Sequence, residues 1–137
     1  MARFVLDASV TLAWHFEDEA QPYADRVLDR LVQGDTALVP SLWSLEVVNI
    51  LLVGERRNRP SRESAAFLSD LMDLPVQVLP MGTDRIFSEV IELGRLHSLS
   101  SYDAAYLDLA MQMAVPLATA DRRLRRAAAD AGVEILQ

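Results

Sequence analysis

Short apolar runs alternate with longer helical patterns along the whole chain, and this alternation constrains the fold more than any other feature. Residues 3–6, 37–39, 76–79, 116–119 and 133–136 are predicted strands. A short helix from Ser9 and longer helices at 21–32, 41–57, 61–74, 83–99, 101–114 and 122–131 are predicted between and after them. We therefore predict an α/β fold, with a central, mostly parallel sheet flanked by helices on both faces.

Length and composition favour one globular domain over residues 1–137. The chain has 137 residues, of which 51% are hydrophobic and 24% are charged, and it contains no cysteine. Disulfide scaffolds and thiolate metal sites are therefore excluded. The first apolar run ends too soon at Asp7 for a signal peptide, and no run approaches the roughly 20 residues of a membrane span. We expect a soluble, cytoplasmic protein that does not enter a membrane.

Three aspartates stand where ligands bind in such folds. Asp7 directly follows the first predicted strand, and Asp121 follows the strand that ends at Thr119. Asp103 lies in the first turn of the helix that begins at Ser101. Parallel sheets bind ligands beyond the carboxyl ends of their strands, which favours a site here. The alternative is that each aspartate only caps a helix or interacts with its dipole.

Glu46 is less easily explained by local structure. Between 42 and 53 the only polar residues are Ser44, Glu46 and Asn49, so this helix is predicted to be buried. A buried carboxylate needs a partner, which can be an arginine, a hydrogen-bond network or a metal ion. Several carboxylates in one crevice raise one another's pKa unless cations lie between them. Mg²⁺ and Mn²⁺ prefer such oxygen ligands.

The charge of the chain is unusual in its distribution. The net charge of −7 argues against binding to phosphate, but all 13 basic residues are arginine. Eight of them form two clusters: Arg56, Arg57, Arg59, Arg62, and Arg122, Arg123, Arg125, Arg126. Clustered guanidinium groups bind phosphate well, and Arg122 and Arg123 are candidate phosphate contacts. Solvated helix faces or pairs with nearby acids are the alternative.

The four acids lie in segments that resemble the motifs of one known family. These segments are residues 4–9 (FVLDAS), 44–49 (SLEVVN), 101–107 (SYDAAYL) and 117–124 (LATADRRL). Each motif alone is weak, but their order and spacing over nearly the whole chain are specific. Together they resemble the PIN-domain nucleases, in particular the VapC-type toxins of bacterial and archaeal toxin–antitoxin modules.

The resemblance implies an activity, a metal and partners. It implies a Mg²⁺- or Mn²⁺-dependent endoribonuclease that inhibits translation and is neutralised by a cognate antitoxin. The implied metal-binding and catalytic residues are Asp7, Glu46, Asp103 and Asp121. The implied supporting polar residues are Ser9, Asn49 and Thr119. It also implies a homodimer within a larger toxin–antitoxin complex.

Three other functions fit parts of the sequence. A catalytically silent member of the family would bind RNA or a protein without cutting. His15 and His97 could serve a metal-independent ribonuclease, although neither has an obvious partner in the sequence. An aspartyl nucleophile at Asp7 would suit phosphoryl transfer, but Ser9 stands where that chemistry usually has a second aspartate.

Overall fold

The computed structural model of the protein describes residues 1–16, 21–57 and 61–137. Within these ranges four strands form one sheet: β1 (Arg3–Leu6), β2 (Thr36–Pro40), β3 (Val76–Leu79) and β4 (Leu117–Ala118). Every strand pair is parallel, and the order across the sheet is β3-β2-β1-β4. The apolar side chains of β1 are completely buried, as expected for a central parallel strand covered on both faces.

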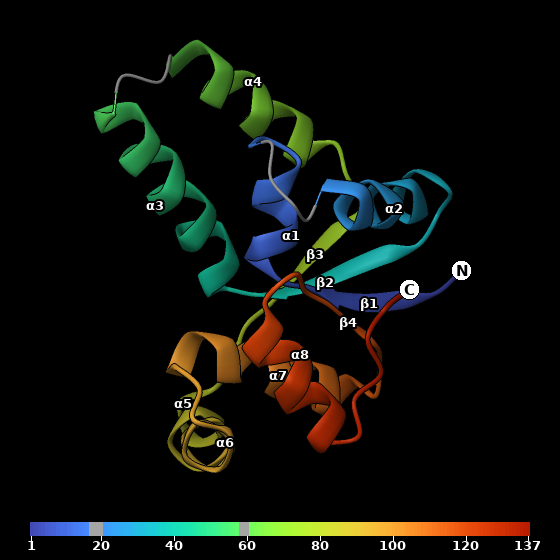
Figure 1. Ribbon diagram of the computed structural model, residues 1–137, viewed down its shortest axis with the longest axis vertical. Helices are drawn as coiled ribbons and strands as arrows, with labels where there is room; N and C mark the ends of the chain where they lie inside the picture. Colours follow the sequence, from blue (N-terminus) through green and yellow to red (C-terminus); the bar gives the residue numbers. More distant parts are fainter. Residues whose placement is uncertain (17–20, 58–60) are drawn as a thin grey trace.

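The helices form two layers, one on each face of the sheet (Figure 1). The first layer contains α1 (Ala8–Ala13), α2 (Gln21–Val32), α3 (Leu42–Arg56) and α4 (Ser61–Met72). The second contains α5 (Thr83–Arg85), the π-helical turn η1 (Ile86–Val90), α6 (Ile91–His97), α7 (Ser101–Met113) and α8 (Arg122–Asp130). This is the predicted α/β fold.

The connections change direction between β1 and β4. The chain moves from β1 outward to β2 and β3 through the first layer, and then returns through the second layer to β4 on the other side of β1. After β1 the chain turns into α1, whereas after β4 it turns into α8 on the opposite face (Figure 1). Such a switch point opens a crevice at the carboxyl ends of the two strands, and ligands bind there in open α/β sheets.

Helix α7 forms the centre of the second layer because most of its length is apolar. All residues from Ala104 to Ala110 are buried against the sheet and the neighbouring helices. The buried carboxylate of Asp108 is held by Arg85, which donates from Nε and Nη2 at 2.7 and 2.9 Å. This bidentate pair attaches α5 to α7.

Two predictions of local structure were wrong, and a third, the helix at 83–99, is correct except for a π-helical turn and an earlier end. The expected strand at 133–136 is reduced to a single bridge between Leu117 and Ile135. The expected helix at 83–99 contains η1 and ends in a left-handed residue, Ser98. Helix α3 was expected to be buried, but its side chains at Leu45 and Leu52 are 74% and 45% exposed. Part of the apolar surface of α3 is therefore not covered by the described residues of this chain.

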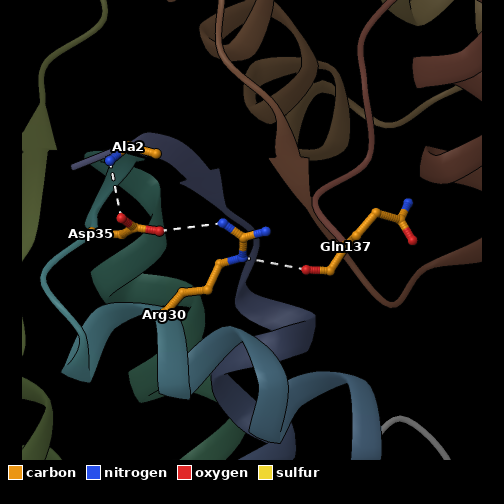
Figure 2. A network of polar contacts seen from close by, with 4 residues as sticks. All are labelled: Ala2, Arg30, Asp35 and Gln137. Carbon is orange, nitrogen blue, oxygen red and sulfur yellow. Dashed lines mark hydrogen bonds and ion pairs between the residues drawn. The ribbon is translucent and has the colours of Figure 1, made fainter.

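A polar network joins the two termini at the amino ends of the strands (Figure 2). The backbone N–H of Ala2 donates to Asp35 Oδ1 at 3.0 Å, and Arg30 lies 3.4 Å from Asp35 Oδ2. Arg30 Nε also donates to the carbonyl oxygen of Gln137 at 3.3 Å. Because Ala2 and Asp35 precede β1 and β2, this network lies at the amino ends of the strands, away from the switch point.

None of the helices in the described ranges has the length and apolar character needed to cross a membrane.

Candidate acidic site

The two strands at the switch point deliver Asp7 and Asp121 to the same crevice. Asp7 directly follows β1 and is buried, and its backbone N–H donates to Ala118 of β4 at 3.0 Å. Thr119 and Asp121 follow β4, with Asp121 at the N-cap of α8. Glu46 extends from the first half of α3, and Asp103 lies in the first turn of α7. Charge interactions link Asp7 with Asp121, and Asp103 with the other three acids, so the four carboxylates lie near one another at the carboxyl ends of β1 and β4.

Two hydroxyl groups hold Asp7 through one of its oxygens. Ser9 Oγ and Thr119 Oγ1 both donate to Asp7 Oδ2, at 2.7 and 2.6 Å. Each hydroxyl in turn accepts a backbone N–H, Ser9 from Ala120 at 3.0 Å and Thr119 from Asp121 at 3.1 Å. These N–H groups set the direction of both hydroxyl protons, which fixes the carboxylate. The backbone N–H of Ser9 also interacts with the Asp7 carboxylate and lowers its pKa.

The capping interpretation is correct for Asp121 and wrong for Asp103. Asp121 Oδ1 accepts the backbone N–H of Leu124 at 3.0 Å, so this carboxylate caps α8 while it faces the crevice. In α7 the cap is Ser100, whose Oγ accepts the N–H of Asp103 at 3.1 Å. The Asp103 carboxylate has no hydrogen-bond partner among the described residues. The Asp103 side chain therefore caps no helix, although its charge lies in the first turn of α7.

The partner of Glu46 is a tyrosine. Tyr106 Oη donates to Glu46 Oε1 at 2.6 Å, joining α7 to α3 across 60 residues of sequence. A hydrogen bond is therefore one partner of Glu46, and no arginine forms an ion pair with it among the described residues. Tyr106 was not among the predicted site residues, although a tyrosine within a buried run of alanine and leucine signals a hydroxyl that needs an acceptor. Which acceptor it finds depends on the fold.

The electrostatics of the crevice show that the four acids influence one another. Burial, together with the charges of Asp7, Asp121 and Glu46, raises the pKa of Asp103 from its usual 3.8 to about 6. The pKa of Asp7 is raised by burial and by Asp121, against the lowering effect of its two hydroxyl donors.

The pKa of Glu46 is also raised by burial, and the Tyr106 hydrogen bond lowers it in part. The crevice therefore carries more negative charge than its protein surroundings compensate.

The donor set fits a hard divalent cation in its chemistry. The crevice offers only carboxylate and hydroxyl oxygens, which Mg²⁺ and Mn²⁺ prefer, and a cation would relieve the repulsion that raises these pKa values. In the described part of the chain, no three acidic or histidine side chains already stand in a ligating arrangement. Closing the site on an ion would need side-chain rotation, which is open to Asp103 because this side chain is partly exposed and its carboxylate has no hydrogen-bond partner in the described ranges.

Of the predicted supporting polar residues, Ser9 and Thr119 contact Asp7 and Asn49 does not. Asn49 is exposed on α3, and no hydrogen bond within the described ranges connects it to the acids. His15, the candidate for metal-independent catalysis, packs its ring against Phe67, with the ring centroids 4.6 Å apart. This contact gives the ring a packing role.

The arginines near the site have different environments. Arg122 and Arg123 are exposed in the first turn of α8, and the charge of Arg123 lowers the pKa of Asp103. Arg125 is instead part of the scaffold, because its Nε donates to the carbonyl oxygen of Thr119 at 2.7 Å and its guanidinium lies over the Tyr23 ring.

In the other cluster, Arg56 and Arg57 are exposed at the far end of α3. Arg56 lies about 15 Å along the helix from Glu46. Arg59 and the side chain of Arg62 lie outside the described residues.

Comparison with known proteins places this fold in a family. VapC20 of Mycobacterium tuberculosis, described as a sarcin-ricin loop cleaving toxin, is 16% identical, with a TM-score of 0.70 over 90% of this chain and 94% of that one. A chain of VapBC2 from Rickettsia felis, bound to a promoter DNA fragment, is 12% identical, with a TM-score of 0.66 over 99% and 98%. FitAcB from Neisseria gonorrhoeae is 15% identical, with a TM-score of 0.63 over 100% and 97%.

At these identities the likenesses show the shared fold. A search of curated proteins by sequence finds no match. The family comparison is decisive, because residues 4–130 match the PIN domain. The chain belongs to the PIN-domain family.

Proposed function

We propose that this protein is a divalent-cation-dependent endoribonuclease, the toxin of a toxin–antitoxin module, which inhibits translation by hydrolysing RNA phosphodiester bonds in the cytoplasm. The convergence of Asp7, Glu46, Asp103 and Asp121 at the switch point carries this proposal. Its similarity to VapC20 and to toxin–antitoxin complexes supports the toxin assignment. Membership of the PIN family supports nuclease chemistry.

In this proposal Asp7 and Asp103 are the principal metal ligands. Asp7 has one oxygen fixed by two hydroxyl donors, and the Asp103 carboxylate has no hydrogen-bond partner in the described ranges. Glu46 and Asp121 complete the pocket directly or through water, each with one oxygen already in a hydrogen bond. A bound Mg²⁺ or Mn²⁺ would lower the pKa of a water molecule and stabilise the charge of the transition state.

The substrate backbone would meet cationic side chains beside the acids. Arg122 and Arg123 extend into solvent from the turn that follows Asp121, so a phosphate bound at the acids would lie near them. Phosphate contacts of this kind position a nucleic acid without reading its sequence. The proposed roles of Arg122 and Arg123 are therefore substrate binding, and the role of Ser9 and Thr119 is to hold Asp7.

Partners are proposed from the apolar surface that this chain leaves exposed. On α3, Leu45 is 74% exposed, and on η1 and α6 Phe87 is 76% and Ile91 43% exposed. Large exposed apolar side chains on several neighbouring helices favour protein contacts. We propose that they serve a homodimer and a cognate antitoxin within a larger complex. Sedimentation of the purified chain, alone and with its antitoxin, tests this assembly.

The test of the function is cleavage by purified, antitoxin-free protein. Structured and unstructured RNAs are incubated with Mg²⁺, with Mn²⁺ or with EDTA, and the products are resolved on a denaturing gel. Cleavage that requires a divalent ion supports the proposal. Retention of intact RNA under every condition would instead identify a catalytically silent binding module, and cleavage that persists in EDTA would indicate a metal-independent mechanism.

A further inference from the structure

The hydrogen bond between Tyr106 and Glu46 connects two helices from opposite layers. Figure 1 shows α3 and α7 on opposite sides of the sheet. Tyr106 Oη nevertheless donates to Glu46 Oε1 at 2.6 Å. This contact joins the two helices beside the carboxyl ends of the strands. Among the described residues, no other side chain makes a hydrogen bond to Glu46.

The two partners differ in how firmly they are held. Tyr106 is completely buried within α7. Glu46 is only partly buried, and the next residue along α3 on its N-terminal side, Leu45, is 74% exposed. The buried tyrosine therefore sets the orientation of the less buried glutamate.

The hydrogen bond uses only one of the two glutamate oxygens. The Tyr106 hydroxyl donates to Oε1 at 2.6 Å, and among the described residues no side chain donates to Oε2.

We propose that Tyr106 is a positioning residue of the acidic site, which holds Glu46 in register with Asp7 so that one glutamate oxygen faces the shared crevice. This inference rests on the proposed metal-dependent function. It does not place Tyr106 in contact with metal or RNA, because its hydroxyl acts through Glu46. Groups that orient metal ligands in this way typically change affinity or activity by 10- to 100-fold when removed.

The test is Tyr106→Phe, which keeps the buried ring and removes only the hydroxyl. We expect Mn²⁺ affinity, measured by calorimetry, to fall roughly 10- to 100-fold. We expect kcat for RNA cleavage to fall while KM for RNA stays the same. Tyr102→Phe is the matched control, since this tyrosine lies on the same helix with its side chain 59% exposed, and it should leave Mn²⁺ affinity unchanged.

A double variant separates positioning from a general structural effect. In a Glu46→Ala background, Tyr106→Phe should cause no further loss of Mn²⁺ affinity, whereas a packing role would weaken both backgrounds equally. Crystal structures of the wild type and Tyr106→Phe give a readout that needs neither metal nor activity. Glu46 should occupy one rotamer in the wild type and several in the variant.

A single unchanged Glu46 rotamer in Tyr106→Phe would overturn the inference. A wild-type protein that binds no Mn²⁺ and cleaves no RNA would instead contradict the proposed function, and the rotamers would still decide the role of Tyr106.

Discussion

Asp103→Asn should stabilise the metal-free protein at neutral pH while it impairs the site. The folded protein raises the pKa of Asp103 from 3.8 to about 6, so between these values the folded state binds more protons than the unfolded state. The free energy of unfolding therefore decreases as the pH rises through this window, and it stays lower above it. Asparagine removes this penalty because it carries no charge.

The size of the effect follows from three contributions. The rise in pKa corresponds to roughly 3 kcal/mol between the two protonation states. Asp103 is only half-buried, so solvent screening reduces this to about half. Asparagine also loses the favourable interaction of a negative charge with the first turn of α7, which costs about 0.5 kcal/mol. The net gain is about 1 kcal/mol, or a few degrees in Tm.

Urea unfolding in EDTA at pH 7.5 and pH 4 measures this gain directly. We expect Asp103→Asn to be the more stable protein at pH 7.5 and to lose its advantage at pH 4, where the wild-type carboxyl is protonated in the fold. Asp29→Asn, at an exposed position of α2, is the control and should show no such gain. A variant less stable than the wild type at pH 7.5, or equally favoured at both pH values, would refute the reasoning.

Three further changes probe the surroundings of the site. Thr119→Val removes a buried hydroxyl that donates to Asp7 and accepts the backbone N–H of Asp121. The free energy of unfolding, measured by urea titration, should fall by about 1–3 kcal/mol. An unchanged midpoint would show that the hydroxyl is dispensable. Arg85→Met leaves the buried Asp108 carboxylate without its cation and should lower the free energy of unfolding by about 1–3 kcal/mol. This loss is smaller than for a fully buried pair because the Arg85 side chain is 36% exposed. Equal stability of the variant and the wild type would argue against a stabilising ion pair. Arg123→Gln should weaken RNA binding and reduce the salt dependence of log K by about one, and an identical slope would remove Arg123 from the interface.

Much of the fold could be predicted because its signals are local. Short apolar runs separated by amphipathic helices specify parallel strands with crossovers, and β1 was predicted with its observed bounds. The positions of Asp7 and Asp121 follow from that topology, since the carboxyl ends of adjacent parallel strands share one edge.

The errors arose where distant parts of the molecule decide the outcome. Residues 133–136 are apolar enough for a strand, but they pair with β4 only at Leu117, in a single bridge with Ile135. Helix α3 has an apolar surface all round, and periodicity cannot distinguish burial within one chain from burial against another. The choice of Tyr106 as the partner of Glu46 depends on how α3 and α7 meet, and neither local segment specifies that meeting.

A calorimetric titration of Mn²⁺ into the wild type and Asp7→Asn examines most directly whether the acidic crevice is a cation site. Asn at this position keeps an oxygen acceptor for the hydroxyls of Ser9 and Thr119, so the fold should survive, as circular dichroism would verify. We predict saturable binding to the wild type and affinity at least roughly tenfold lower in the variant. Absence of binding to the wild type, or equal affinity in the two proteins, would contradict a metal site built around Asp7.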